Sequence, residues 1–223
     1  MFVIDRTQGL LFHNGRAYAP ATRIWQAAPL PSAAEPADPV QAFAWLQRES
    51  GHPLKAPIGI IGPNEATAEQ VAVAAEAGAI VGRMGLAMLC GGRQGVMEGA
   101  ARGAASVGGI AIGLLPHGDP SQANPFVTVA IASGIGEARN AIIAQAGACL
   151  IVVGDSHGTL SEVALGLRLG KRVFGLAGAA RVDGVVHLAS PEELPVALAR
   201  ELLKIQEGSH HSGGGSDQQT ARC

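Results

Sequence analysis

Between residues 58 and 178 the sequence alternates short apolar segments with longer Ala-rich segments, and this alternation restricts the fold more than any other feature. The apolar segments have the length of β-strands and comprise Ile58–Ile61, Leu86–Cys90, Ile110–Leu115, Val127–Ile131, Leu150–Val153 and Arg172–Gly175. The segments between them predict helices over Thr67–Met84, Val96–Ser106, Glu137–Ala146 and Thr159–Leu169. Repeated β-α units of this length favour a parallel sheet covered by helices on both faces. We therefore predict an α/β protein with a doubly wound, mainly parallel sheet.

The regions on either side of this alternation have a different character. Residues 1–50 predict an N-terminal extension. It contains a β-ribbon with breaks at Gln8-Gly9 and Asn14-Gly15, the second of which favours a tight hairpin turn, then an Ala/Pro-rich linker over Ala27–Pro39 and a helix over Val40–Arg48. The α/β domain is expected over residues 56–207 and ends with an amphipathic helix within residues 191–206. Residues 208–223 have too few apolar side chains to form a core, so we predict a disordered tail.

Composition and charge exclude several classes of function. The chain has 16 Lys and Arg against 18 Asp and Glu, a net charge of −2, so we expect no nucleic-acid partner. The longest nearly apolar stretch, residues 141–154, is shorter than the ~20 residues that cross a bilayer, so we expect no membrane partner. The first residues lack a secretory signal, which favours a cytoplasmic protein. Cys90 and Cys149 are interpreted as core residues, and no Cys/His spacing predicts a metal site or a cofactor.

Four glycine-containing loops, each after a predicted strand and before a predicted helix, are the candidate ligand-binding segments. They comprise residues 62–67, 91–95, 133–139 and 154–159. Parallel sheets bind ligands at the carboxyl ends of their strands, and glycine lets backbone N–H groups approach an anion. Glycine after a strand also simply makes a tight turn, and for a single loop both interpretations remain open. Neither GxxxxGK[ST] nor GxGxxG occurs, which argues against a P-loop ATPase and a nicotinamide dehydrogenase.

The segment Gly158-Thr159-Leu160-Ser161-Glu162 carries the most chemical information. Gly158 and Thr159 fall in the first turn of a predicted helix, where free N–H groups and a hydroxyl can hold a phosphate. Glu162 lies three residues beyond Thr159, so both side chains share one helix face. The same spacing also fits a capping box between Thr159 and Glu162, and the two roles are compatible.

These loops resemble the motifs of the Rossmann-like family long mislabelled as lysine decarboxylases. That family includes the LONELY GUY phosphoribohydrolases, which release a cytokinin base from its nucleoside 5′-monophosphate. The resemblance spans residues 56–178 and rests on Gly91-Gly92-Arg93-Gln94-Gly95-Val96-Met97, on Arg139 and on residues 154–162. The family's Pro-Gly-Gly is Gly154-Asp155-Ser156 here, and its Lys after the Arg is Asn140. This pattern is closer to the family's uncharacterised nucleotide-binding branch and to the molybdenum-cofactor carriers. Lysine decarboxylation is rejected, because none of Lys55, Lys171 and Lys204 lies in a glycine loop.

The resemblance implies a nucleotide-binding protein and assigns a role to individual residues. Glu162 and Arg139 are the expected catalytic residues of an N-glycosidic hydrolase that would give free base and ribose 5-phosphate. The expected ligand- and phosphate-binding residues are Gly91, Gly92, Arg93, Gly95, Met97, Asn140, Gly158 and Thr159. The alternative is a non-enzymatic binder, either a molybdenum-cofactor carrier or a nucleotide-sensing module. The resemblance also implies a homodimer or larger homo-oligomer.

Residue types alone leave simpler roles open for several of these positions. Arg139 also fits a surface residue paired with Glu137 or Glu162, and Arg93 fits a solvent-exposed residue. His157 fits a turn position, and Met97 fits core packing behind its loop.

Overall fold

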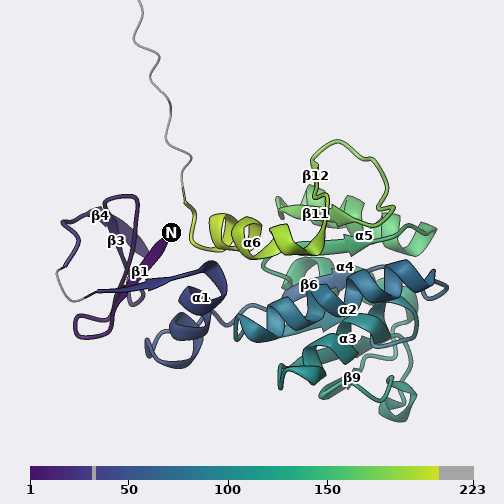
Figure 1. Ribbon diagram of the computed structural model, residues 1–223. Coiled ribbons are helices and arrows are strands. Elements are labelled where there is room, and N and C mark those ends of the chain that lie inside the picture. Colours follow the sequence, from purple (N-terminus) through teal and green to yellow (C-terminus); the bar gives the residue numbers. More distant parts are fainter. Residues whose placement is uncertain (32–33, 206–223) are drawn as a thin grey trace, which may run out of the picture.

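The computed structural model describes residues 1–31 and 34–205, and it contains a large parallel sheet and a small antiparallel sheet (Figure 1). The predicted disordered tail, residues 208–223, lies outside the described residues. No helix in the described ranges is long and apolar enough to span a membrane.

The seven-stranded sheet confirms the predicted Rossmann-like fold. Its strands are β6 (Ile58–Ile61), β7 (Met88–Cys90), β8 (Ala111–Leu115), β9 (Val129–Ala132), β10 (Leu150–Val153), β11 (Val173–Leu176) and β12 (Val185–His187). Their order is β12-β11-β10-β6-β7-β8-β9, and every neighbouring pair is parallel. The chain builds the sheet outward from β6 to β9 and then crosses to the other side of β6 with β10. In such sheets a crevice opens at the carboxyl ends of the two strands where the direction switches.

Helices cover both faces of this sheet. They are α2 (Ala68–Arg83), α3 (Val96–Ser106) and α6 (Leu194–Leu202) on one face, and α4 (Arg139–Ala146) and α5 (His157–Arg168) on the other. Helix α1 (Pro39–Arg48) contacts α2, α6 and the N-terminal strands. Successive residues of β10 alternate between the faces, as the period of a strand requires. Ile151 packs in the core cluster that includes α1, α2, α3 and α6, while Val152 packs with α4 and α5. The residues of the central strands β6, β7, β10 and β11 are all buried, which explains their nearly continuous apolar sequence.

Local sequence signals predicted most of these helices and strands. Where the structure differs from the prediction, the difference has a physical reason. The predicted capping box of Thr67 and Gln70 opens α2. Strand β12 was not predicted, because it is short and only Val185 and Val186 in it are apolar, and Val186 and His187 are exposed. The predicted helix over Glu137–Ala146 begins as the short 3-10 helix η2 (Gly136–Ala138) and becomes α-helical at Arg139.

The N-terminal residues form a five-stranded antiparallel sheet in the order β4-β3-β2-β1-β5, beside α1 (Figure 1). Its strands are β1 (Phe2–Asp5), β2 (Leu10–His13), β3 (Arg16–Ala19), β4 (Ile24–Ala27) and β5 (Glu35–Ala37). Asn14 and Gly15 both have positive φ, as the predicted tight hairpin turn requires. The segment predicted as a linker differs from expectation, because β5 within it pairs with β1.

Candidate functional site

A cavity of about 490 Å³ lies at the carboxyl ends of β6, β7 and β10, where the order of the strands switches direction. Most of the residues predicted for the site line it, namely Gly91, Arg93, Met97, Arg139, Asn140, Gly158, Thr159 and Glu162. They come from three of the predicted loops, from the first turns of α3 and α4 and from the first two turns of α5. The remaining lining residues are Ile61, Gly62, Asn64, Glu137, Ser156, His157 and Ser161.

Gly92 and Gly95 do not line the cavity, and each instead permits close packing of the loop after β7. A Cβ atom on Gly95 would lie 2.2 Å from the carbonyl oxygen of Asn64. A Cβ atom on Gly92 would lie 2.8 Å from Cδ2 of Leu115, and both glycines have positive φ. Both glycines have a structural role in the tight turn, which was the simpler interpretation of a glycine loop, and their ligand contact stays a prediction.

Sequence reasoning missed three polar lining residues, Asn64, Ser156 and Ser161. The side-chain Oδ1 of Asn64 accepts a hydrogen bond of 3.2 Å from the N–H of Gln94, which ties the loop after β6 to the loop after β7. Ser156 could have been found, because Ser is a typical N-cap residue and it lies two residues before Gly158, which was expected in the first turn of the helix. No comparable signal distinguishes Asn64 or Ser161.

The first turn of α5 presents N–H groups to the cavity. Ser156 is the N-cap, and its Oγ accepts from the N–H of Thr159 at 3.1 Å and lies 2.8 Å from the Thr159 hydroxyl. The helix therefore begins at His157, and Glu162 lies in the second turn, so the capping box proposed between Thr159 and Glu162 is not formed. Across residues 1–31 and 34–205, no group accepts a hydrogen bond from the N–H of His157 or Gly158. A helix start with free N–H groups is a favourable position for an anion.

Arg139 is buried at the start of α4, with 4% of its surface exposed. A Cβ atom on Gly91 would lie 2.7 Å from Nη2 of Arg139 and 2.8 Å from the sulfur of Met97, so glycine at this position makes room for the guanidinium group. Nη1 of Arg139 lies 3.7 Å from Oε1 of Glu162 and 3.8 Å from Oε2 of Glu137. Both distances are longer than the donor–acceptor distance of a hydrogen bond. Within the described chain the guanidinium group donates no hydrogen bond, and its Nε is buried without a partner.

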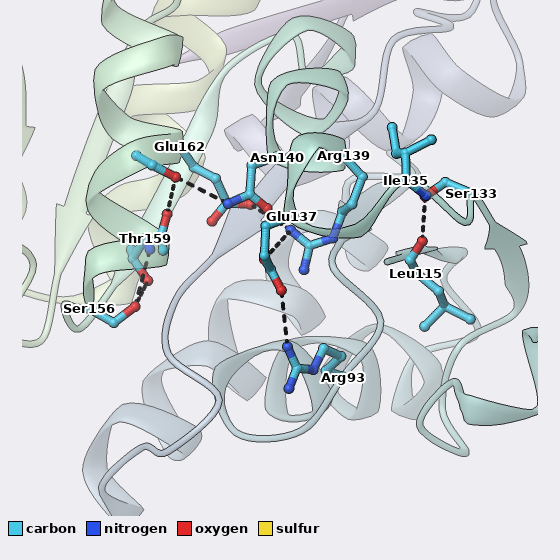
Figure 2. Close-up of polar contacts among 12 residues, drawn as sticks. Arg93, Leu115, Ser133, Ile135, Glu137, Arg139, Asn140, Ser156, Thr159 and Glu162 are labelled. Atoms are coloured by element: carbon cyan, nitrogen blue, oxygen red, sulfur yellow. Dashed lines mark hydrogen bonds and ion pairs between the residues drawn. The ribbon is translucent and has the colours of Figure 1, made fainter. Parts of the chain in front are cut away.

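Glu162 projects from α5 toward Arg139 and is 6% exposed (Figure 2). Burial raises the pKa of its carboxyl group to about 7, against the opposing effect of the Arg139 charge, and Glu137 raises it further. Near neutral pH this carboxyl group therefore exchanges a proton readily, as an acid or base in catalysis must.

A chain of hydrogen bonds joins α4 to α5 beside this pair. Nδ2 of Asn140 donates to Oγ of Ser161 at 3.1 Å, and that hydroxyl donates to the carbonyl oxygen of Gly158 at 2.7 Å. Oδ1 of Asn140 is buried and has no partner in the part of the chain that the structure describes. On the other side of the cavity, Nη1 of Arg93 lies 3.5 Å from Oε1 of Glu137 (Figure 2). The site thus combines two guanidinium groups, two carboxyl groups and a free helix start.

Arg139 and Met97 each have the simpler role that the sequence left open, ion pairing and core packing respectively, and both also line the cavity. Arg139 pairs with both Glu137 and Glu162, but it is buried rather than a surface residue. Met97 is 7% exposed and belongs to the core cluster while it also lines the cavity.

Comparisons with known proteins agree with the motifs. The model of the SLOG cluster4 family matches residues 55–202. A protein from Archaeoglobus fulgidus is 38% identical over 136 residues, which cover 61% of this chain and 89% of the relative.

Two solved structures have a similar fold over almost their whole length. The molybdenum cofactor binding protein from the phototrophic bacterium Rippkaea orientalis has a TM-score of 0.62 and 33% identity, covering 67% of this chain and 99% of the other. The Moco carrier protein from Chlamydomonas reinhardtii has a TM-score of 0.62 and 32% identity, covering 68% and 100%. These matches confirm the resemblance drawn from the glycine loops, including its carrier-like branch. The chain belongs to the SLOG cluster4 family.

Proposed function

We propose that the protein binds a small molecule with a phosphate group in the cavity at the switch point of the sheet. The observation that carries this proposal is the Arg139 guanidinium group, which is buried and lines the cavity but donates no hydrogen bond within the described residues. Leaving buried charged donors without acceptors is unfavourable, and a phosphate oxygen would supply them. The free N–H groups of His157 and Gly158 support the same class of ligand.

Molybdenum cofactor is the first candidate ligand, and the protein would act as its carrier. The two structures described above are a cofactor-binding protein and a carrier protein, and both match over 99% or more of their length. The pterin of this cofactor bears a phosphate. In this proposal the phosphate lies against the first turn of α5 and Arg139, while Asn140 offers its free Oδ1 to a donor on the ligand.

Hydrolysis of a nucleoside 5′-monophosphate is the second candidate, and the pKa of Glu162 favours it. Cleavage of the N-glycosidic bond develops positive charge on the ribose, which a carboxylate beside the sugar stabilises. Glu162 would orient the attacking water, whose hydroxyl adds to C1′ while its proton passes to the departing base. Arg139, 3.7 Å from Glu162, would anchor the phosphate or donate to the base.

Replacing Arg139 tests the shared binding proposal. We expect Arg139→Gln to weaken binding of the phosphate-bearing ligand by about 10- to 100-fold, because hydrogen bonds to a charged group contribute about 1.5–3 kcal/mol. Binding is measured by calorimetry with a panel of nucleoside 5′-monophosphates, and by the molybdenum and pterin content of protein purified from cells that make the cofactor. Arg83→Gln is the control, because Arg83 is exposed on α2 and its one ion pair with a described residue is with Glu76. Equal binding by the wild type and Arg139→Gln would contradict the proposal.

The two candidates differ in turnover. The hydrolase predicts free base from a nucleoside 5′-monophosphate, detected by chromatography, and loss of that activity in Glu162→Gln. A carrier predicts bound molybdenum and pterin with no base released by either protein. The homo-oligomer and the cytoplasmic location implied by the sequence stay predictions.

A further inference from the structure

Glu137 bridges the two guanidinium groups of the cavity. Its Oε1 lies 3.5 Å from Nη1 of Arg93, and its Oε2 lies 3.8 Å from Nη1 of Arg139. Figure 2 shows the carboxylate between the two arginine side chains, which come from the loop after β7 and from the start of α4. One oxygen toward each guanidinium group is also how an anionic group of a ligand would bind there.

The Glu137 side chain can leave this position without moving the backbone. It is 66% exposed, and the side-chain partners that its carboxylate has in the described ranges are the two arginines. The backbone before it is fixed, because the N–H of Gly136 donates to Pro116 at 2.9 Å and Oγ of Ser133 donates to Leu115 at 2.7 Å. A change of side-chain rotamer therefore opens the space between the arginines, while Arg139 stays buried in place.

The space between Arg93 and Arg139 lies apart from the first turn of α5. Ser156 and Thr159 lie on the opposite side of Glu162 and Asn140 from Arg93 (Figure 2). Arg93 also lines a neighbouring cavity of about 480 Å³ beyond the carboxyl end of β8, so the binding surface continues past the arginines. Positive groups are thus present at both ends of the first cavity.

We propose that the space between Arg93 and Arg139 is a second anion subsite, which Glu137 fills in the empty protein and which a second anionic group of the ligand fills by displacing it. The inference rests on the proposed function, because it assigns the first anionic group to the start of α5. The subsite thus extends the proposed function to ligands with two linked anionic groups, as in a diphosphate, which should bind more tightly than ligands with one.

Removing the Glu137 charge tests the subsite with two inorganic probes. Pyrophosphate carries two linked anionic groups, and orthophosphate carries one. We expect Glu137→Gln to bind pyrophosphate about fivefold more tightly than the wild type at low salt, because the exposed carboxylate of Glu137 no longer competes for the two guanidinium groups. The gain for orthophosphate should be smaller. Affinities are measured by calorimetry, and circular dichroism verifies the fold.

Two controls separate competition at the subsite from a general effect of charge. Glu76→Gln removes a similarly exposed carboxylate, 3.7 Å from Arg83 on α2, and should leave the affinity for pyrophosphate unchanged. In a protein that already carries Arg93→Gln, adding Glu137→Gln should raise the affinity for pyrophosphate by less than half of the increase seen without Arg93→Gln. The inference is overturned if Glu137→Gln binds pyrophosphate no more tightly than the wild type, or if the gain persists without Arg93. The proposed binding of a phosphate-bearing ligand is tested separately by Arg139→Gln with nucleotides. Failure of the second subsite can therefore be distinguished from failure of the proposed function.

Discussion

Arg139 and Glu162 form a buried pair of opposite charges that make no hydrogen bond to each other. Their nearest charged atoms are 3.7 Å apart, and each residue is less than a tenth exposed. Desolvation of the carboxylate outweighs the attraction of the arginine, so the pKa of Glu162 is raised rather than lowered. Such a pair does little for stability and is typical of a site prepared for a ligand.

The raised pKa of Glu162 predicts a pH-dependent stability. Its folded-state pKa of about 7 exceeds the ordinary value of 4.5, so the folded protein binds more protons between these values. The contribution of this group to the free energy of unfolding therefore falls by about 3 kcal/mol as the pH rises from 4.5 through 7. Urea unfolding across this range should show that loss in the wild type and not in Glu162→Gln. Glu76→Gln should keep the pH dependence of the wild type. Parallel pH profiles for the wild type and Glu162→Gln would refute the assignment.

At the scale of elements, α2 and α3 approach so closely that their backbones touch. A Cβ atom on Gly103 of α3 would lie 1.8 Å from the carbonyl oxygen of Ala75, and one on Gly78 of α2 would lie 2.0 Å from that of Ala100. Helix α3 begins directly after the loop of residues 91–95, so this contact fixes the loop that bears Gly91 and Arg93. Both helices are rich in Ala and Gly because larger side chains would not fit between backbones that lie so close together.

Gly103→Ala tests this contact. A methyl group there meets backbone that cannot rotate away, so we expect the free energy of unfolding to fall by about 1–3 kcal/mol or more. Denaturant unfolding measures the loss, and the affinity for the phosphate-bearing ligand should weaken as the loop shifts. Gly118→Ala is the matched control, because a Cβ atom at Gly118 meets nothing within 4 Å. Equal stability of the two variants would show that α2 and α3 can move apart without lowering the free energy of unfolding.

At the scale of the whole molecule, the N-terminal sheet is joined to the α/β domain through a shared core. The family model begins at residue 55, so this sheet and α1 lie outside the matched region. Tyr18 and Phe43 nevertheless belong to the same buried cluster as Ile58 of β6. Nε1 of Trp25 on β4 also donates a 2.7 Å hydrogen bond to the carbonyl oxygen of Leu203, beyond the end of α6. The two ends of the described chain are therefore held together.

Trp25→Phe should loosen this connection. The variant keeps an aromatic ring but loses the indole donor, which contributes about 1 kcal/mol. We expect faster amide hydrogen exchange in residues 194–205, together with a similar drop in the free energy of unfolding. Leu30→Ala is the control, because Leu30 is 62% exposed and its truncation should change stability by less than about 0.5 kcal/mol. Unchanged exchange at residues 194–205 in Trp25→Phe would contradict the proposed role of the hydrogen bond.

The sequence by itself determined the features that depend on neighbouring residues. Asn14-Gly15 predicted its hairpin turn, Thr67 with Gln70 predicted the start of α2, and the alternation of strands and helices predicted the parallel sheet. Its glycine loops also indicated the family, because their spacing matched that of the family's motifs. Each of these signals acts within a few residues, where hydrogen bonds and backbone sterics are set locally.

Only the tertiary structure decided which of these residues meet and how deeply they are buried. It separated Gly91, which makes room for Arg139, from Gly92 and Gly95, which shape the turn. It also paired β5 with β1 and placed Glu137 between two arginines from different loops. The hydrogen-bond-free guanidinium of Arg139 and the raised pKa of Glu162 follow from the same packing. Desolvation and charge depend on distances between segments far apart in the chain, and those distances exist only once the sheet has brought its strand ends together.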